Sequence, residues 1–130
     1  MRDISGNFGT NAGKIWSALN EKGSLKKEEI ITIADLDEYG FDTGIGWLAR
    51  ENKVARVDEQ YKLDNTNLEY EIGTYAGKVW KILDTWEDAD IESIKLLSNL
   101  NDEQVRSALG WLAKEDKIWF NENNRLTLKP

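Results

Sequence analysis

The feature that most constrains this chain is an internal repeat with a spacing of 64 residues. The segment GWLARENKV at 46–54 returns as GWLAKEDKI at 110–118. The same offset aligns FGTNAGKIW at 8–16 with IGTYAGKVW at 72–80, and 16 of the 47 positions between residues 8 and 54 are identical without a gap. A repeat unit this long predicts one small domain present twice, because a solenoid unit of roughly 20–50 residues would recur more often. We therefore expect one domain at 1–64 and a second at 65–130.

The composition excludes several kinds of chemistry. The 130 residues include no cysteine and no histidine, which removes disulfides, zinc thiolates, thiol nucleophiles and the usual general base. The acidic stretch from Asp84 to Glu92 invites a calcium interpretation. However, an EF-hand loop starting at Asp88 would need glycine and glutamate where Ser93 and Asn99 stand. No phosphate-binding loop and no nucleophile beside a base can be found. We expect no enzymatic activity, no cofactor and no metal site.

The charge balance argues against nucleic acid as the partner. The formal net charge is −7. Residues 1–64 carry nine cations and twelve anions, and residues 65–130 carry eight and twelve. Non-specific affinity for nucleic acid comes mainly from cations that release counterions from phosphates. No apolar run approaches the length of a signal peptide or membrane span, so we expect a cytoplasmic protein that does not bind membranes.

Apolar periodicity predicts the same order of elements in both copies. A short half-buried strand is expected from the alternation at residues 4–8 and again at 68–72. Each copy should then contain three helices and a β-hairpin. The expected helices lie near 10–20, 26–36 and 38–51 and near 74–84, 91–100 and 102–115, and the hairpins near 54–63 and 118–128.

Several residues are expected to start these helices or to fill their cores. Asn101 with Gln104 three positions later is a capping-box pattern, and Asp37 takes the cap position in the first copy. The candidate caps of the first helices are Thr10 or Asn11, and Thr74. The expected core residues are Trp16, Leu48, Trp80 and Leu112.

Three helices, a tight break before the third and then a two-stranded hairpin form the order of a winged helix-turn-helix domain. The segment ALGWLAKEDKI at 108–118 resembles the third helix and wing entry of winged-helix transcription regulators. Together with IGTYAGKVW at 72–80, it resembles a family of small prokaryotic winged helix-turn-helix domains of unknown function. The resemblance implies an α+β, mostly helical fold with two tandem winged-helix domains, and it brings no activity with it. Tandem acidic winged helices in protein-assembly machinery, such as ESCRT-II subunits and accessory subunits of chromosome-organising complexes, are similar in architecture and charge.

The third helix of DNA-binding winged-helix proteins enters the major groove and reads bases with its exposed side. Opposite the apolar stripe, that side holds Asp42, Thr43 and Gly46 in the first copy and Arg106, Ser107 and Gly110 in the second. Acidic residues near the helix starts oppose phosphate contacts there. If DNA is the partner, the cations that must carry the binding are Arg50, Arg56, Arg106, Lys114 and Arg125.

Two glycines in the third helices point instead to a protein interface. A glycine inside a helix costs roughly 0.5–1 kcal/mol relative to alanine, yet Gly46 and Gly110 occupy the same position in both copies. Either another backbone approaches closely there, or the neighbouring Trp47 and Trp111 need the room. Trp119 in the second hairpin is either an interface anchor or part of the packing between the domains.

Two functions therefore remain open. The favoured hypothesis is a non-enzymatic binding module that engages protein partners, or its own copy, through the glycine–tryptophan face of the third helices and the second wing. The alternative is a DNA-binding transcriptional regulator, which family analogy favours and the charge opposes.

Overall fold

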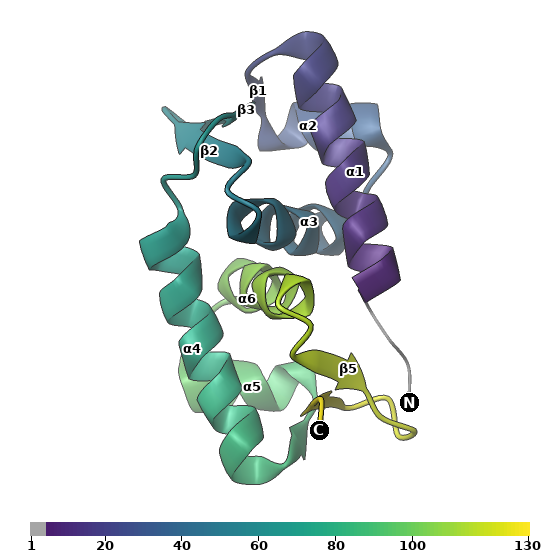
Figure 1. Cartoon of the computed structure of the whole chain (residues 1–130), viewed down its shortest axis with the longest axis vertical. Coiled ribbons are helices and arrows are strands. Elements are labelled where there is room, and N and C mark those ends of the chain that lie inside the picture. Colours follow the sequence, from purple (N-terminus) through teal and green to yellow (C-terminus); the bar gives the residue numbers. More distant parts are fainter. Residues whose placement is uncertain (1–4) are drawn as a thin grey trace.

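A computed structural model describes residues 5–130, which form two units of the same architecture (Figure 1). Each unit has three helices and a three-stranded antiparallel sheet. The first unit consists of α1 (Ser5–Lys22), β1 (Leu25–Lys26), α2 (Lys27–Ala34), α3 (Glu38–Arg50), β2 (Val54–Val57) and β3 (Gln60–Leu63). The second consists of α4 (Glu69–Trp86), β4 (Asp88–Ala89), α5 (Ile91–Ser98), α6 (Asp102–Lys114), β5 (Ile118–Phe120) and β6 (Leu126–Leu128).

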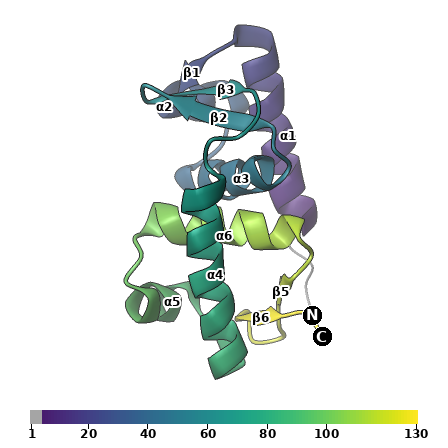
Figure 2. The ribbon, with the colours of Figure 1, turned by 60° about the vertical axis from the view of Figure 1, so that its left-hand side comes forward.

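The two units meet through their third helices. In Figures 1 and 2, α3 and α6 lie against one another in the middle of the molecule, and the two sheets lie towards opposite ends of its long axis. The strand orders, β1-β3-β2 and β4-β6-β5, are equivalent, and no sheet formed by the described residues spans both units. The internal repeat is therefore confirmed as two copies of one fold.

The starts of the third helices are confirmed, and their caps fix where the helix-turn-helix break falls. Asp37 accepts a hydrogen bond from the backbone N–H of Gly40 at 2.7 Å. At the start of α6, Asn101 and Gln104 each accept a hydrogen bond from the backbone N–H of the other, at 2.8 and 3.0 Å. These bonds satisfy N–H groups that have no partner inside the helix. The third helix of each unit consequently begins three residues after a left-handed residue ends the second.

The first helices begin earlier than predicted, and the strands expected before them are wrong. Tyr70 and Ile72 lie in α4, and the aligned Phe8 lies in α1. Residue 4, where the first alternation begins, falls outside the described residues. Leu68 and Ile72 are four residues apart, and this spacing suits one helix face as well as a strand.

The expected caps of the first helices are also wrong, because Thr10 and Thr74 lie inside them. Their hydroxyls donate hydrogen bonds to the backbone oxygens of Gly6 and Tyr70, at 2.8 and 2.6 Å. A threonine can satisfy its hydroxyl in this way within a helix, so it does not have to mark a helix start. Asn11, the alternative cap, also lies within α1.

Both hairpins are confirmed, and each gains a strand that the sequence pattern did not reveal. In the first unit, Val54 of β2 pairs with Leu63 of β3. In the second, Ile118 of β5 pairs with Leu128 of β6. The added strands, β1 and β4, contain only two residues each, which is too short for an alternation to be visible.

The two hydrophobic cores exchange side chains at the starts of α1 and α4. Phe8 of the first unit is buried in the core of the second, and Leu68 and Ile72 are buried in the core of the first. Phe8 and Ile72 occupy equivalent repeat positions, so each unit lends the same residue to the other. Leu48 and Leu112 are core residues, as predicted, and each is 2% exposed.

Trp16 and Trp80, by contrast, were wrongly predicted to be core residues. Each side chain is 40% exposed. The buried stripe of the helix runs instead through neighbouring smaller residues, such as Ile15 and Val79, which are fully buried. The identical exposure of the two tryptophans agrees with the repeat. Their assignment to the core, however, was wrong.

The exposure of Trp80 predicts a modest effect of its truncation on stability. Trp80→Ala should lower the free energy of unfolding by less than about 2 kcal/mol, whereas Leu83→Ala should lower it by about 2–5 kcal/mol because Leu83 is 1% exposed. Urea unfolding of the two variants would measure both. Equal losses would contradict the placement of Trp80 on the surface.

Candidate functional site

The closest approach between the two units lies at the glycines of the third helices. A Cβ atom placed on Gly46 would lie 1.9 Å from the backbone oxygen of Ser107. One placed on Gly110 would lie 1.9 Å from the backbone oxygen of Thr43. No side chain fits at such a distance, so the helices approach this closely only because both positions are glycine. The two contacts are equivalent under the 64-residue offset, and the units are thus related by an approximate two-fold rotation.

The contacts also fix the relative direction of α3 and α6. Beyond the glycines, Arg50 lies 3.2 Å from Glu115, and Lys114 lies 3.7 Å from Glu51. The glycine contacts join residues 43–46 to residues 107–110, and the ion pairs join residues 50–51 to residues 114–115. Later residues of one helix therefore meet later residues of the other, so the two helices run parallel. Each cation also lies over a ring of the opposite unit: Arg50 is 5.6 Å from the Trp111 centroid and Lys114 is 5.3 Å from that of Trp47.

The side of the third helix that was expected to face solvent is buried between the units. Asp42, Thr43 and Ser107 are 1%, 0% and 6% exposed. Gly46 and Gly110 are buried with them. The expectation of an exposed base-reading face was wrong because it treated each unit alone, and the opposite unit covers that face. Of the two explanations for the glycines, the close approach of another backbone is the correct one.

An ionic network lies at the start of these helices. The Asp42 carboxylate is 3.1 Å from the Lys27 ammonium of its own unit and 3.4 Å from the Arg106 guanidinium of the other. Lys27 also reaches Glu103 across the interface, at 3.5 Å. Burial raises the pKa of Asp42, and the two cations oppose that shift. Burial alone would lower the pKa of Lys27, but Asp42 and Glu103 together raise it, so Lys27 stays charged at neutral pH.

Each of the five cations named for DNA binding is paired with a carboxylate among the described residues. Arg50, Arg106 and Lys114 pair across the unit interface, as described above. The other two lie on the wings: Arg56 is 3.0 Å from Glu71, and Arg125 is 2.8 Å from Asp88. These cations are already neutralised within the chain.

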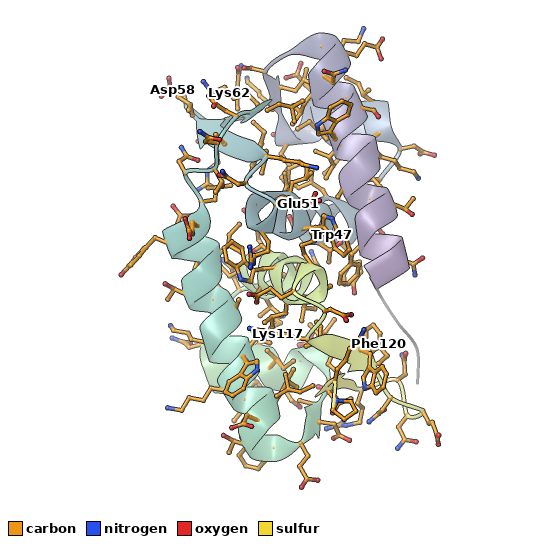
Figure 3. The ribbon with its side chains drawn as sticks, viewed as in Figure 1. Trp47, Glu51, Asp58, Lys62, Lys117 and Phe120 are labelled. Carbon is orange, nitrogen blue, oxygen red and sulfur yellow. The ribbon has the colours of Figure 1, made fainter. Side chains whose placement is uncertain are left out.

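Trp119 is half-buried on the second wing. It pairs with Thr127 in the sheet, and the Lys129 ammonium lies 5.7 Å from its ring centroid. Its indole Nε1 is buried and finds no hydrogen-bond partner within the described residues. The adjacent Phe120, labelled in Figure 3, packs against the core of the second unit. Trp119 therefore presents only part of its ring at the surface.

Two equivalent surface grooves, which we call the tryptophan grooves, lie beside the third helices. Each is formed by small residues and a tryptophan of the first helix, together with the tryptophan of the third helix. Figure 3 labels Trp47 and Glu51, which line the first groove, and Lys117, which lines the second, all near the middle of the molecule. The first includes Gly9, Gly13, Trp16, Trp47 and Glu51, and the second includes Gly73, Gly77, Trp80, Trp111 and Glu115.

The glycines of these grooves differ in what they contact. A Cβ on Gly9 would lie 3.1 Å from the Trp47 ring, and one on Gly73 would lie 3.6 Å from Trp111. Gly13 and Gly77 are exposed, and a Cβ on either would have nothing within 4 Å. Internal packing therefore does not explain Gly13 and Gly77. Neither glycine was among the predicted site residues, although a helical glycine at the same position in both copies is a signal visible in the sequence.

The described residues show neither a metal site nor a membrane span. Within residues 5–130, no group of three or more acidic, histidine or cysteine side chains could hold a metal ion. No helix of that part of the chain is long and apolar enough to cross a membrane.

Three helices with a tight turn between the second and third, followed by a hairpin wing, define each unit as a winged helix-turn-helix domain. The chain belongs to the family described as "Winged helix-turn-helix domain (DUF2582)", whose model matches residues 1–64 and again residues 67–128. The function of this family is unknown.

One similar protein is the uncharacterised protein MJ1608 of Methanocaldococcus jannaschii. It is 38% identical over 56 residues, which make up 42% of this chain and 80% of that protein. MJ1608 is therefore close in length to one of the two units. No solved structure matches the chain.

The steric difference between the two kinds of glycine predicts opposite effects of alanine. Gly46→Ala or Gly110→Ala should lower the melting temperature, because the new methyl group would overlap the facing backbone. Gly13→Ala and Gly77→Ala should instead stabilise the protein by about 0.5–1 kcal/mol, the usual gain for an exposed helix position. Thermal unfolding of the four variants would test this. A stabilising Gly46→Ala would contradict the close contact of α3 and α6.

Proposed function

We propose that the chain is a non-enzymatic protein-binding module that receives segments of a partner in its two tryptophan grooves. The observation that carries the proposal is the pair of open glycines, Gly13 and Gly77, each beside an exposed tryptophan. A helical glycine has a cost in stability, and nothing in the part of the chain that the structure describes occupies the space above either one. A partner side chain could occupy that space while the indole covers its apolar surface.

The proposal revises which part of the third helix meets a partner. Gly46 and Gly110 pack against the backbone of the opposite unit, whereas Trp47 and Trp111 each line one of the grooves. The approximate two-fold relation of the units gives the partner two similar sites. This arrangement supports binding of a two-fold symmetric partner or of two copies of one segment, which would raise the overall affinity.

DNA binding through the third helices is the alternative, and family resemblance is what favours it. Against it stand the burial of Asp42, Thr43 and Ser107 between the units and the pairing of the candidate cations with carboxylates. Major-groove reading needs an exposed third helix. The two units would have to separate before either helix could enter DNA.

The groove hypothesis is tested by filling the space above the glycines. The double variant Gly13→Gln/Gly77→Gln should remain folded, because within residues 5–130 no atom beyond the helix's own neighbouring backbone lies within 4 Å of either added Cβ. When the protein is used to capture partners from a lysate of its source, the double variant should fail to retain proteins that the wild type retains. Quantitative mass spectrometry of the retained proteins measures the loss, and circular dichroism checks the fold.

The matched control for this experiment is Gly6→Gln. Gly6 is also an exposed, helical glycine of α1 with nothing within 4 Å of its Cβ position, but it lies outside the groove. The control should retain the wild-type set of proteins. An unchanged set in the double variant, or an equal loss in the control, would refute the groove hypothesis.

The DNA-binding alternative is tested by measuring affinity for DNA directly. We expect binding to mixed-sequence duplex at 150 mM salt to be weaker than about 10⁻⁵ M, within or below the ordinary non-specific range. A titration at two salt concentrations would measure the affinity and its salt dependence. Nanomolar, sequence-dependent binding at 150 mM salt would instead establish DNA as the partner.

A further inference from the structure

The second unit carries a further groove between α4 and α5 that the proposed function does not use. We call it the α4/α5 groove; it includes Lys78, Lys81, Ile82, Trp86 and Leu97. Trp86 is 60% exposed and Leu97 is 51% exposed. Large apolar side chains gathered at one exposed place mark candidate interaction sites, whereas isolated ones need no explanation.

The first unit serves as an internal control for this groove. At the positions of Ile82 and Trp86, the first unit has Ala18 and Lys22, and it forms the same fold. The fold therefore does not require an isoleucine and a tryptophan at this surface. Ile82 packs in part against the core of its own unit. Trp86 is 60% exposed, and its presence in one copy only points to a role outside the chain.

The charges around the groove select the partner. Lys78 and Lys81 line the groove, and neither forms a salt bridge with any residue in the described part of the chain. No carboxylate of residues 5–130 lines it, although Asp84 and Glu87 are close in sequence. In the first unit, Ser17 takes the place of Lys81. Two unpaired lysines beside apolar side chains are complementary to an acidic, partly apolar partner.

The shape of the groove favours a helical partner. The groove residues of α4 fall at positions 78, 81, 82 and 86, along one face of the helix for about 12 Å. Leu97 of α5 contributes from the second wall of the groove. Two neighbouring helices with an apolar floor provide the arrangement into which an amphipathic helix lays its apolar side.

We infer that the α4/α5 groove binds an acidic amphipathic helix of a partner protein. The inference rests on the proposed function in that it assumes a protein-binding module. The α4/α5 groove shares no lining residue with either tryptophan groove. A partner could therefore engage both surfaces, or two partners could engage one surface each.

Selection from a peptide library tests the inference without a known partner. The displayed peptides would carry leucines at helix positions i, i+3, i+4 and i+7, with all other positions randomised, and the target would be the full chain. We expect the selected peptides to be enriched in aspartate and glutamate and to bind with dissociation constants of about 1–100 μM. Neutral or basic selected peptides, or no enrichment, would overturn the inference.

Variants of the chain then locate the binding of the selected peptides. Trp86→Lys installs the residue of the first unit and should weaken binding at least about tenfold, the scale expected for loss of an aromatic anchor. The control is Tyr70→Lys, since Tyr70 is 85% exposed on the same helix but lies outside the groove. The control should leave the affinity unchanged. Undiminished binding by Trp86→Lys, with the fold confirmed by circular dichroism, would contradict the assignment.

The charge reversal Lys78→Glu/Lys81→Glu completes the test. It should weaken the binding of the acidic peptides and strengthen the binding of peptides in which lysine replaces the acidic residues. The groove-filling variant Gly13→Gln/Gly77→Gln should bind the acidic peptides as the wild type does. If the groove-filling variant alone fails to bind the acidic peptides, the peptides occupy the tryptophan grooves. That outcome overturns this inference and supports the proposed function. If the Trp86 variant alone loses them, the inference holds whatever the outcome for the tryptophan grooves.

Discussion

The close contact between α3 and α6 is the constraint on which the rest of the molecule depends. Two helices pack this tightly only where the residues at the contact are small. Gly46 is that small residue in α3, and Gly110 is its counterpart in α6. The contact covers the third helices, brings Phe8 and Ile72 into each other's cores, and sets the two tryptophan grooves around one approximate two-fold axis. A surface that many winged-helix proteins present to DNA is thereby used to join the two units. The tryptophan grooves that we propose as binding sites then lie where the first helix of each unit meets the third.

The charges at this contact show how the two copies have diverged. Asp42 and Arg106 occupy the same repeat position and lie 3.4 Å apart across the axis. Two identical units would place two aspartates or two arginines there, and like charges at that distance would repel. Opposite charges favour the pairing of the first unit with the second over the pairing of like units. A buried ion pair gives little net stability, since removing both charges from water offsets the attraction, and choice of partner is the better-supported reason for it.

The sequence predicted the elements better than it predicted what faces solvent. The repeat, the Asp37 cap, the Asn101–Gln104 capping box and the hairpin patterns are local signals, and they placed the third helices and both wings correctly. The errors concern burial. Trp16 was assigned to the core because tryptophan is large and apolar, although the stripe beside it already fills the core. Asp42 and Thr43 were assigned to the surface because they lie opposite the apolar stripe of their helix, although the second unit covers them. The second error could not be corrected from one unit alone, because the burial of Asp42 and Thr43 depends on contacts with the other unit, about 64 residues away in the sequence.

The most direct test of this account is a nuclear Overhauser measurement on the unmodified protein in solution. A Cβ on Gly46 would lie 3.0 Å from the Cα of Ser107, and one on Gly110 would lie 2.9 Å from the backbone nitrogen of Trp47. The glycine Hα protons occupy that space, so strong cross-peaks should join Gly46 Hα to Ser107 Hα and Gly110 Hα to the backbone N–H of Trp47. The presence of both cross-peaks would establish the joined third helices. Absence of both, in a spectrum that contains the expected contacts within each unit, would show that the units are separate and that the third helices are free to meet another partner.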